Sequence, residues 1–415
     1  MSKLAIVGGR PVTRNLLAGA KLARRADLER KYLLEVHRGG VWDNWPGAKS
    51  MGATFAREWA AFNGSKFAAL VTNGTHAIQL ALEALDIGPG DEVIVPGLTW
   101  QATASAVVDV NAVPVLVDVD ERTWCIDPAL AEAAITPRTR AIIPVHLFHR
   151  MAEMGTLLRI ARRHGLHVIE DCAHVHGSRW GRRGAGTLGA CGCFSFQMSK
   201  LVTAGEGGAI LTQDERLYWK IESLRVCGRE AKEGVSVHSG NFRATSLQAA
   251  VLRGQLSAFR RNAPRIDRNG LGLDKAVADA PGVEPLRRSR QITRMCGYAL
   301  GFLYDPAAFD GLGAETFRRA LSAELGVNFG TTYTPLSHSE VYSPQTKKRH
   351  RLSKSYVRAI TPSRWKLPVA ERLWRDRAVL SPWRIYACPP RRARLLTDAI
   401  ARIHQRRDEL RAIER

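Results

Sequence analysis

A single lysine, Lys200, lies where a segment typical of a buried strand passes into a glycine-rich segment. The stretch from 193 to 208 reads CFSFQMSKLVTAGEGG, with aromatic residues before the lysine and glycines after it. An exposed lysine, the ordinary alternative, requires neither of these neighbours. An amine sheltered from water loses its proton more readily and can then attack a carbonyl carbon. The context of Lys200 therefore predicts a nucleophilic lysine at the end of a strand.

An acidic residue, Asp171, stands at the end of a second apolar segment. The run from 168 to 174, VIEDCAH, predicts a buried strand that leads directly to this carboxylate. A carboxylate in such a place can bind a metal ion, cap a helix or hold a protonated ring nitrogen. Nearby histidines supply possible metal ligands, namely His146, His149, His174 and His176. Their spacing matches no known ligand set, so we expect no metal site.

Two turns could complete a binding site. Residues 72 to 75, TNGT, predict a turn from a strand into a helix, where backbone N–H groups favour a phosphate, although an ordinary turn explains them equally well. Trp100 follows a strand in PGLTWQAT (96 to 103) and could either stack on a flat cofactor or fill the core. The run GAGTLG from 184 to 189 matches a dinucleotide-binding pattern but precedes a strand, so we reject that interpretation.

The elements that must position these residues alternate between strands and helices. Apolar runs from 67 to 211 alternate with amphipathic segments such as 74 to 85 and 154 to 164. This order predicts an α/β fold with a mostly parallel sheet, which binds ligands at the carboxyl ends of its strands. Longer helices are expected at 215 to 227 and 246 to 262. We expect a large domain over 1–260, with an N-terminal arm, and a smaller C-terminal α/β domain over 261–415.

Composition excludes several classes of protein. The 415-residue chain is 45% hydrophobic but has no apolar run long enough to cross a membrane, and its seven scattered cysteines predict free thiols in a cytoplasmic protein. The net charge is +22, and residues 261 to 415 hold about 30 Lys and Arg against about 15 Asp and Glu. These basic residues are not interleaved with stacking aromatics, so we expect no nucleic acid partner. A basic binding protein without catalytic activity is the distant alternative.

The phosphate-binding turn, the aromatic platform, the acid and the lysine are together the parts that a pyridoxal phosphate enzyme needs. The sequence resembles the DegT/DnrJ/EryC1/StrS sugar aminotransferases, which have the fold-type-I architecture of pyridoxal phosphate enzymes, over nearly the whole chain. The most specific similarities are EDCAH at 170 to 174, SFQMSK at 195 to 200, TAGEGG at 203 to 208 and SGNFRATSLQAA at 239 to 250.

The resemblance assigns roles to individual residues. It implies that Lys200 forms a Schiff base with the cofactor and that Asp171 pairs with the pyridinium nitrogen. The remaining residues that it implies for cofactor binding are Gly74, Thr75 and Ser195 at the phosphate, and Trp100 with the Ala173–His174 segment at the ring. Asn241 would reach the phosphate of the neighbouring subunit, which implies a homodimer. The related sugar dehydratases usually replace the lysine with histidine, so Lys200 favours amination.

The substrates are predicted from the same resemblance. Residues 332 to 350 resemble the inosose aminotransferases of aminoglycoside antibiotic pathways, which implies L-glutamine or L-glutamate as amino donor and a keto-cyclitol or keto-sugar as acceptor. Phe148 and His149 depart from the Tyr-Gly of many relatives and could line the substrate mouth. A nucleotide-linked keto-sugar or a pseudo-disaccharide therefore remains an alternative acceptor.

Overall fold

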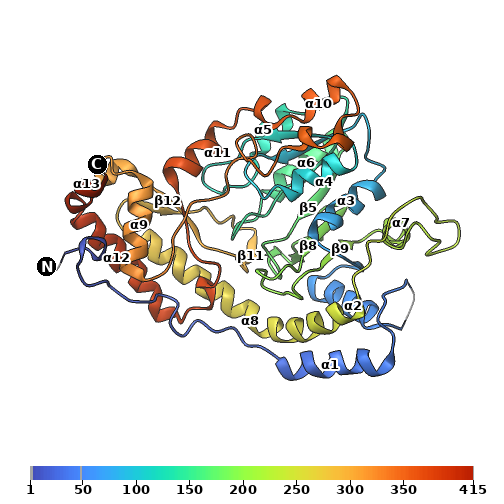
Figure 1. The fold of residues 1–415 in the computed structure, drawn as a ribbon, viewed down its shortest axis with the longest axis horizontal. Coiled ribbons are helices and arrows are strands. Elements are labelled where there is room, and N and C mark those ends of the chain that lie inside the picture. The colour runs from blue at the N-terminus through green and yellow to red at the C-terminus, as the bar shows by residue number, and fades with distance from the viewer. Residues whose placement is uncertain (1–2, 47–48, 415) are drawn as a thin grey trace.

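A seven-stranded sheet lies at the centre of the computed structural model, which describes residues 3–46 and 49–414 (Figure 1). Its strand order is β1-β9-β8-β5-β4-β2-β3. The strands are β1 (Phe67–Val71), β2 (Glu92–Pro96), β3 (Val113–Val117), β4 (Thr139–Ile142), β5 (His167–Asp171), β8 (Cys191–Ser195) and β9 (Gly208–Thr212). Strand β9 pairs antiparallel with both β1 and β8, and the other pairs are parallel. The predicted α/β fold with a mostly parallel sheet is confirmed.

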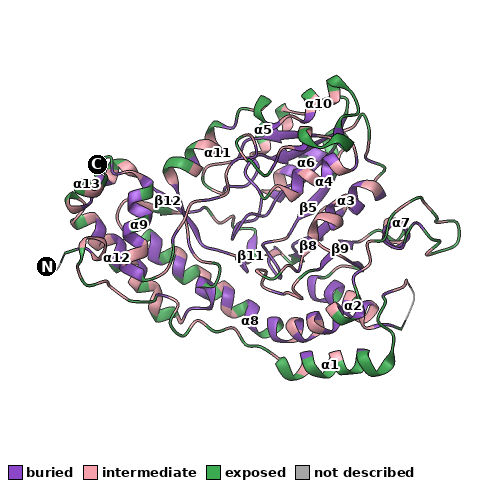
Figure 2. Ribbon diagram, viewed as in Figure 1, coloured by how far each residue is buried: buried purple, intermediate pink, exposed green. Residues whose placement is uncertain are grey.

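The strands are apolar because the sheet is covered by helices. All five residues of β2 are buried, and only the first residue of β5 is exposed. Figure 2 shows buried residues along the sheet and on the inward sides of the helices around it. The helices of this part of the chain are α1 (Ala26–Gly39), α2 (Met51–Asn63), α3 (Gly74–Ala84), α4 (Ala102–Asp109), α5 (Pro128–Ala133), α6 (Met154–His164) and α7 (Glu215–Arg225). Helices α3 and α6 lie where the apolar periodicity predicts them.

Helix α8 (Ser246–Ala278) runs from beside α1 and α2 to α12 in the C-terminal part of the chain (Figure 1). It begins with a capping box between Thr245 and Gln248. The predicted end at Asn262 is wrong, because the helix continues through Pro264. A proline inside a helix removes one hydrogen bond. Here the apolar face continues beyond it, with Ile266 among the buried residues that keep the helix against the core.

The C-terminal part of the chain builds a second, smaller sheet. Its antiparallel strands are β10 (Val283–Pro285), β12 (Gly301–Tyr304) and β13 (Ala378–Leu380). The helices here are α9 (Ala314–Leu325), α10 (Lys354–Ile360), α11 (Pro368–Arg372), α12 (Ala393–Gln405) and α13 (Asp408–Glu414). A third sheet joins both parts of the chain through β6 (Arg179–Trp180), β7 (Arg183–Gly184) and β11 (Ile292–Arg294).

Contacts cross the predicted boundary between residues 260 and 261 in both directions. At the N-terminus, the N–H groups of Ala5 and Val12 donate to the buried carboxylate of Glu324 at 2.8 and 3.1 Å. In return, Asp118 after β3 accepts from the first N–H groups of α11, at 2.7 Å from Val369 and 2.9 Å from Ala370. The boundary itself falls inside α8, so the division into 1–260 and 261–415 stays a prediction.

Arginines of the C-terminal part serve partly as structural donors to backbone carbonyl groups. Arg318 donates to the carbonyl oxygen of Ala378 at 3.0 Å, and Arg392 donates to that of Leu16 at 2.8 Å. A charged donor makes a stronger bond than a neutral one. Part of the basic surplus therefore fixes loops within the fold. None of the helices in the described ranges combines the length and the hydropathy that a membrane span requires.

Candidate active site

Lys200 lies beyond the carboxyl end of β8, as the sequence predicts. Its backbone N–H donates to the carbonyl of Gln197 at 2.9 Å, which turns the chain sharply after the strand. The Lys200 Nζ atom lies 4.8 Å from the centre of the Tyr298 ring. Burial lowers the pKa of the Lys200 amine to about 8, against the opposing effect of the Asp171 carboxylate. A substantial neutral fraction near physiological pH makes this amine a competent nucleophile.

Asp171 is fixed at the carboxyl end of β5, beside β8. Thr103, in the first turn of α4, donates to one carboxylate oxygen at 2.8 Å, and the Ala173 N–H donates to the other at 3.1 Å. Burial raises the pKa of Asp171, while the two hydrogen bonds and the charge of Lys200 act in the opposite direction. A cationic ring nitrogen beside this carboxylate would favour its ionised form, and the carboxylate would in turn favour the protonated ring.

The turn before α3 has the geometry of an anion site. Asn73 caps the helix by accepting from the His76 N–H at 2.9 Å, and the helix then begins at Gly74. The first N–H groups of a helix have no partners within it and carry its positive dipole end. A side chain at position 74 would place Cβ 2.8 Å from the Cβ of Ser195. Glycine is therefore required here for the turn and the end of β8 to approach each other.

Aromatic side chains form the walls of the site. Trp100 is 52% exposed at the rim, with its ring centre 5.8 Å from that of Tyr333. His174 is buried, with its ring stacked on Tyr298 at 4.4 Å between ring centres and an interplanar angle of 7°. Trp100 can therefore flank a flat ligand from the rim, whereas the His174 ring, stacked on Tyr298, lines the interior of the cavity.

These residues surround one cavity of about 600 Å³. The predicted site residues that line it are Gly74, Thr75, Trp100, Asp171, His174, Ser195 and Lys200. Asn241 does not line it: this residue is exposed, and its side chain accepts from the Arg243 N–H at 3.2 Å. The predicted contact of Asn241 with a neighbouring subunit stays a prediction.

The cavity also has lining residues that the sequence did not indicate. Thr103 is in the first turn of α4, and its hydroxyl lies 3.2 Å from that of Thr99, which precedes the helix. Tyr298 and Tyr333 come from distant segments of the C-terminal part. No motif marks Tyr298, and the resemblance of residues 332 to 350 assigns no role to Tyr333. Their position depends on the long-range packing of that part against the sheet.

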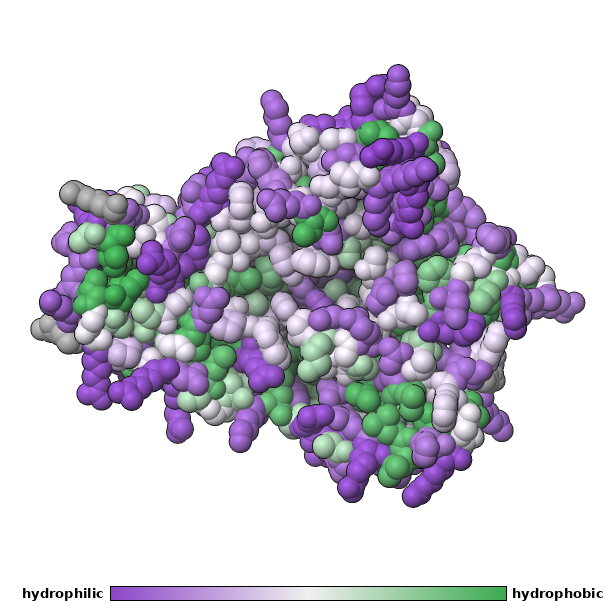
Figure 3. All heavy atoms as spheres, viewed as in Figure 1, coloured by the Kyte–Doolittle hydropathy of each residue, from purple (hydrophilic) through white to green (hydrophobic). Residues whose placement is uncertain are grey.

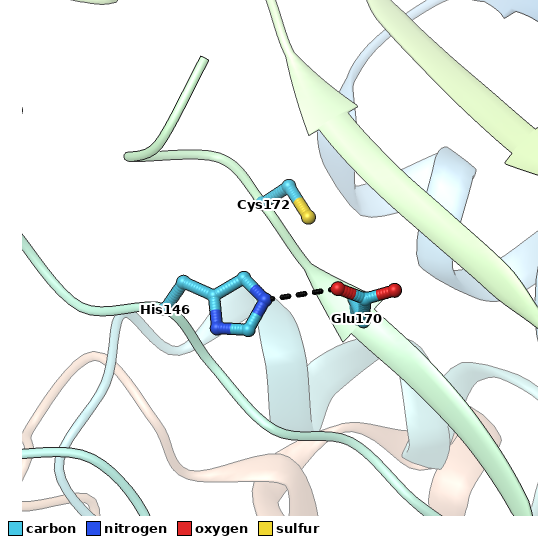
Figure 4. Close-up of side chains that lie close together, drawn as sticks. All are labelled: His146, Glu170 and Cys172. Atoms are coloured by element: carbon cyan, nitrogen blue, oxygen red, sulfur yellow. Dashed lines mark hydrogen bonds and ion pairs between the residues drawn. The ribbon is translucent and has the colours of Figure 1, made fainter. Parts of the chain in front are cut away.

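Buried His146, Glu170 and Cys172 lie close together behind the site (Figure 4). His146 accepts from the Ala152 N–H through Nδ1, so its Nε2–H donates to Glu170 at 3.1 Å. Burial and the neighbouring Glu170 carboxylate raise the pKa of the Cys172 thiol well above its usual value, so the thiol is protonated in this network. The cluster is explained as a hydrogen-bond network.

The carboxylate of Glu170 organises the glycine-rich loop that precedes β8. It accepts from the N–H groups of Gly186 at 3.0 Å, Leu188 at 2.7 Å and Gly189 at 2.9 Å. These residues belong to the GAGTLG run at 184 to 189. The run therefore supplies three backbone N–H donors to the buried carboxylate of Glu170.

A nucleophilic lysine, a buried acid and an anion-binding turn around one cavity define the class, an α/β enzyme of fold type I that carries pyridoxal phosphate. Three features fit this cofactor: the close approach of Gly74 to Ser195, the Asp171 carboxylate held by two hydrogen bonds, and the volume of the cavity. The chain matches the DegT/DnrJ/EryC1/StrS aminotransferase family over residues 24–379, and it belongs to that family. The predicted family, cofactor and enzyme class are thereby confirmed.

Individual relatives agree over nearly the full length. The L-glutamine:2-deoxy-scyllo-inosose aminotransferase of Streptoalloteichus tenebrarius is 40% identical over 90% of this chain and 91% of its own. A provisionally named L-glutamine:3-amino-2,3-dideoxy-scyllo-inosose aminotransferase of the same organism is 38% identical over 99% of this chain and 100% of its own. The crystal structure of 3-amino-5-hydroxybenzoic acid synthase superposes with a TM-score of 0.79, at 30% identity, over 93% of this chain and 98% of that chain.

Proposed function

We propose that this protein transfers the amino group of L-glutamine, or of L-glutamate, to the keto group of a cyclitol in the biosynthesis of an aminoglycoside-type antibiotic. The observation that carries this proposal is the convergence of Lys200, Asp171 and the turn at Gly74 on one cavity. The named substrates of the two similar inosose aminotransferases support the donor and the acceptor.

The proposed roles of the side chains follow from their positions. Lys200 holds the cofactor through its amine, and once displaced by the donor it moves a proton to and from the substrate carbon. Asp171 keeps the ring nitrogen protonated, with Thr103 fixing its carboxylate. The residues that would bind the phosphate are Gly74, Thr75 and Ser195, and those that would flank the ring are Trp100, Ala173 and His174. When bound, pyridoxal phosphate supplies the electron sink that stabilises negative charge at the substrate carbon.

The charges around the cavity favour an uncharged acceptor over a nucleotide-linked sugar. The charged residues among those that line the cavity are Asp171, Lys200 and Glu206. Although the chain has 61 Lys and Arg, no arginine is among those lining residues. Among these lining residues a diphosphate would therefore find no cation other than Lys200, whereas a cyclitol needs only neutral hydrogen-bond partners.

The acceptor is tested directly with purified protein. The enzyme is incubated with L-glutamine and either 2-deoxy-scyllo-inosose, scyllo-inosose or a nucleotide-linked keto-sugar, and the aminated product is detected by mass spectrometry. We expect amination of a cyclitol, and no product from Lys200→Ala with any ketone. Amination of the nucleotide-linked sugar alone would transfer the assignment to that class.

We also infer a homodimer with shared active sites, and a cytoplasmic location. Apolar residues are exposed near the start of α8, namely Leu34, Val41, Trp42 and Leu247, and Figure 3 shows hydrophobic residues gathered over the region of α1, α2 and α8. The exposed Asn241 lies five residues before α8, so we propose that a dimer through this region places it at the neighbouring cavity. All seven cysteines are free, which supports a reducing compartment. Sedimentation of the purified protein tests the dimer.

A further inference from the structure

Tyr333 brings a hydroxyl group into the active-site cavity from the stretch at 332 to 350, to whose individual residues the sequence assigned no role. It lies between α9 and α10 and lines the cavity together with Trp100. The two ring planes meet at 53° with 5.8 Å between their centres. Two aromatic faces in this arrangement offer apolar surface to the C–H groups of a saturated ring. L-Glutamine has no ring to use such a surface, whereas a cyclitol does.

The neighbouring His174 has a defined tautomer. The backbone N–H of Phe148 donates to His174 Nδ1 at 3.2 Å, so this nitrogen carries no proton. Burial and the charge of Lys200 hold the pKa of His174 well below its usual value, so the ring is neutral. The single ring proton of His174 must therefore reside on Nε2.

Two aromatic neighbours fix the orientation of the His174 ring. The ring is stacked between Phe148 and Tyr298, with 5.4 and 4.4 Å between ring centres. Phe148 is itself buried and has a positive φ of 51°, a conformation that is rare for a bulky residue. Such local strain persists only where the surrounding structure imposes it, and it is found preferentially at functional sites.

The tautomer of His174 determines whether the Tyr333 hydroxyl donates or accepts in their contact. His174 Nε2 lies 3.5 Å from the Tyr333 hydroxyl oxygen, and because this nitrogen carries the proton, the oxygen is the acceptor. The hydroxyl proton of Tyr333 is then directed away from His174. Burial raises the pKa of Tyr333, so the phenol keeps its proton and remains a donor at physiological pH.

We propose that the Tyr333 hydroxyl donates a hydrogen bond to an oxygen of the keto-cyclitol, and that Phe148 and His174 are positioning residues that direct this donor. The proposal rests on the proposed function, because it assigns a contact to its acceptor. It makes Tyr333 a substrate-binding residue for the second half of the reaction, in which the ketone is aminated.

The test separates the two half-reactions by the absorbance of the bound cofactor. Wild-type holoenzyme, Tyr333→Phe and Tyr218→Phe are first reacted with L-glutamine, and the aminated enzyme is then mixed with the cyclitol ketone that the wild type uses fastest, beginning with scyllo-inosose. Tyr333→Phe keeps the ring and removes only the hydroxyl. Tyr218→Phe is the matched control, because Tyr218 lies on α7 outside the cavity, with its ring stacked on Phe67 at 4.9 Å.

We expect Tyr333→Phe to reduce kcat/KM of the ketone half-reaction roughly tenfold, as the loss of one neutral hydrogen bond implies. The glutamine half-reaction of Tyr333→Phe, and both half-reactions of the Tyr218→Phe control, should stay within about twofold of wild type, with an unchanged cofactor spectrum. An unchanged ketone half-reaction would overturn the proposal, as would an equal loss in both half-reactions or a shifted cofactor spectrum.

A second measurement does not depend on the ketone. Nitrogen NMR of histidine-labelled wild-type protein, with His174→Gln to assign the signal, should show a neutral ring protonated at Nε2. A proton on Nδ1 would refute the orientation of Tyr333 whatever the enzyme aminates. Failure of the wild type with every cyclitol ketone would instead refute the proposed function, and the two failures are thus distinguished.

Discussion

The lowered pKa of Lys200 predicts a characteristic pH dependence for cofactor capture by the apoprotein. Burial moves this pKa from 10.5 to about 8. At pH 7 about one amine in ten is then neutral, compared with about one in three thousand for an ordinary lysine. Because only the neutral amine attacks the cofactor aldehyde, the gain in reactive fraction is on the order of 300-fold.

The direction of the pH dependence follows from the same pKa. The capture rate should rise about tenfold per pH unit below pH 8 and level off above about pH 8, as the amine becomes fully neutral. Asp171→Asn removes the charge that raises the Lys200 pKa, so the plateau should begin at lower pH in this variant.

The assay is stopped-flow absorbance after mixing apoprotein with pyridoxal phosphate between pH 6 and 10 at constant ionic strength. Parallel measurements with a blocked lysine derivative correct for the titration of the cofactor itself. A rate that keeps rising to pH 10 would refute the buried, depressed amine. A plateau that moves to higher pH in Asp171→Asn would refute the assigned electrostatic coupling.

Three further predictions address the phosphate turn, the buried acid and the dimer. Gly74→Ala places a methyl group 2.8 Å from the Ser195 Cβ; we expect a loss of about 1 to 3 kcal/mol in stability and weaker cofactor binding, measured by thermal melting with and without pyridoxal phosphate. Glu170→Gln turns an amide donor toward backbone N–H donors, and urea unfolding should show a loss of about 3 kcal/mol, whereas a change within 0.5 kcal/mol would contradict the network. Mixing inactive Lys200→Ala with inactive Asn241→Ala protein after subunit exchange should restore activity, because one site per mixed dimer is intact; no recovery in confirmed mixed dimers would exclude the shared site.

The local parts of the site could be predicted from the sequence because each depends on a short segment. Strand β5 has an apolar centre and leads to Asp171, and the segment from β8 to Lys200 alternates apolar with polar residues before it reaches the lysine. The carboxyl ends of adjacent parallel strands meet at one edge of the sheet, and β5 and β8 pair there. The cavity that contains both residues therefore follows from the strand pattern.

The remaining parts depend on long-range packing. Tyr298 and Tyr333 reach the cavity only because the C-terminal part folds against the sheet, and no local periodicity encodes that approach. Helix α8 extends beyond its predicted end, because its buried face continues past Pro264, a residue that ordinarily favours the end of a helix. Thr103 could be predicted only in part, because its hydrogen bond to Asp171 depends on where α4 begins.

Covalent attachment of the cofactor tests the central claim most directly. The protein is incubated with pyridoxal phosphate, reduced with borohydride, digested and mapped by mass spectrometry. The account predicts that the peptide containing Lys200 carries the reduced label and that Lys200→Ala yields an unlabelled protein. A label on another lysine, or a wild-type protein that takes up no label, would contradict it.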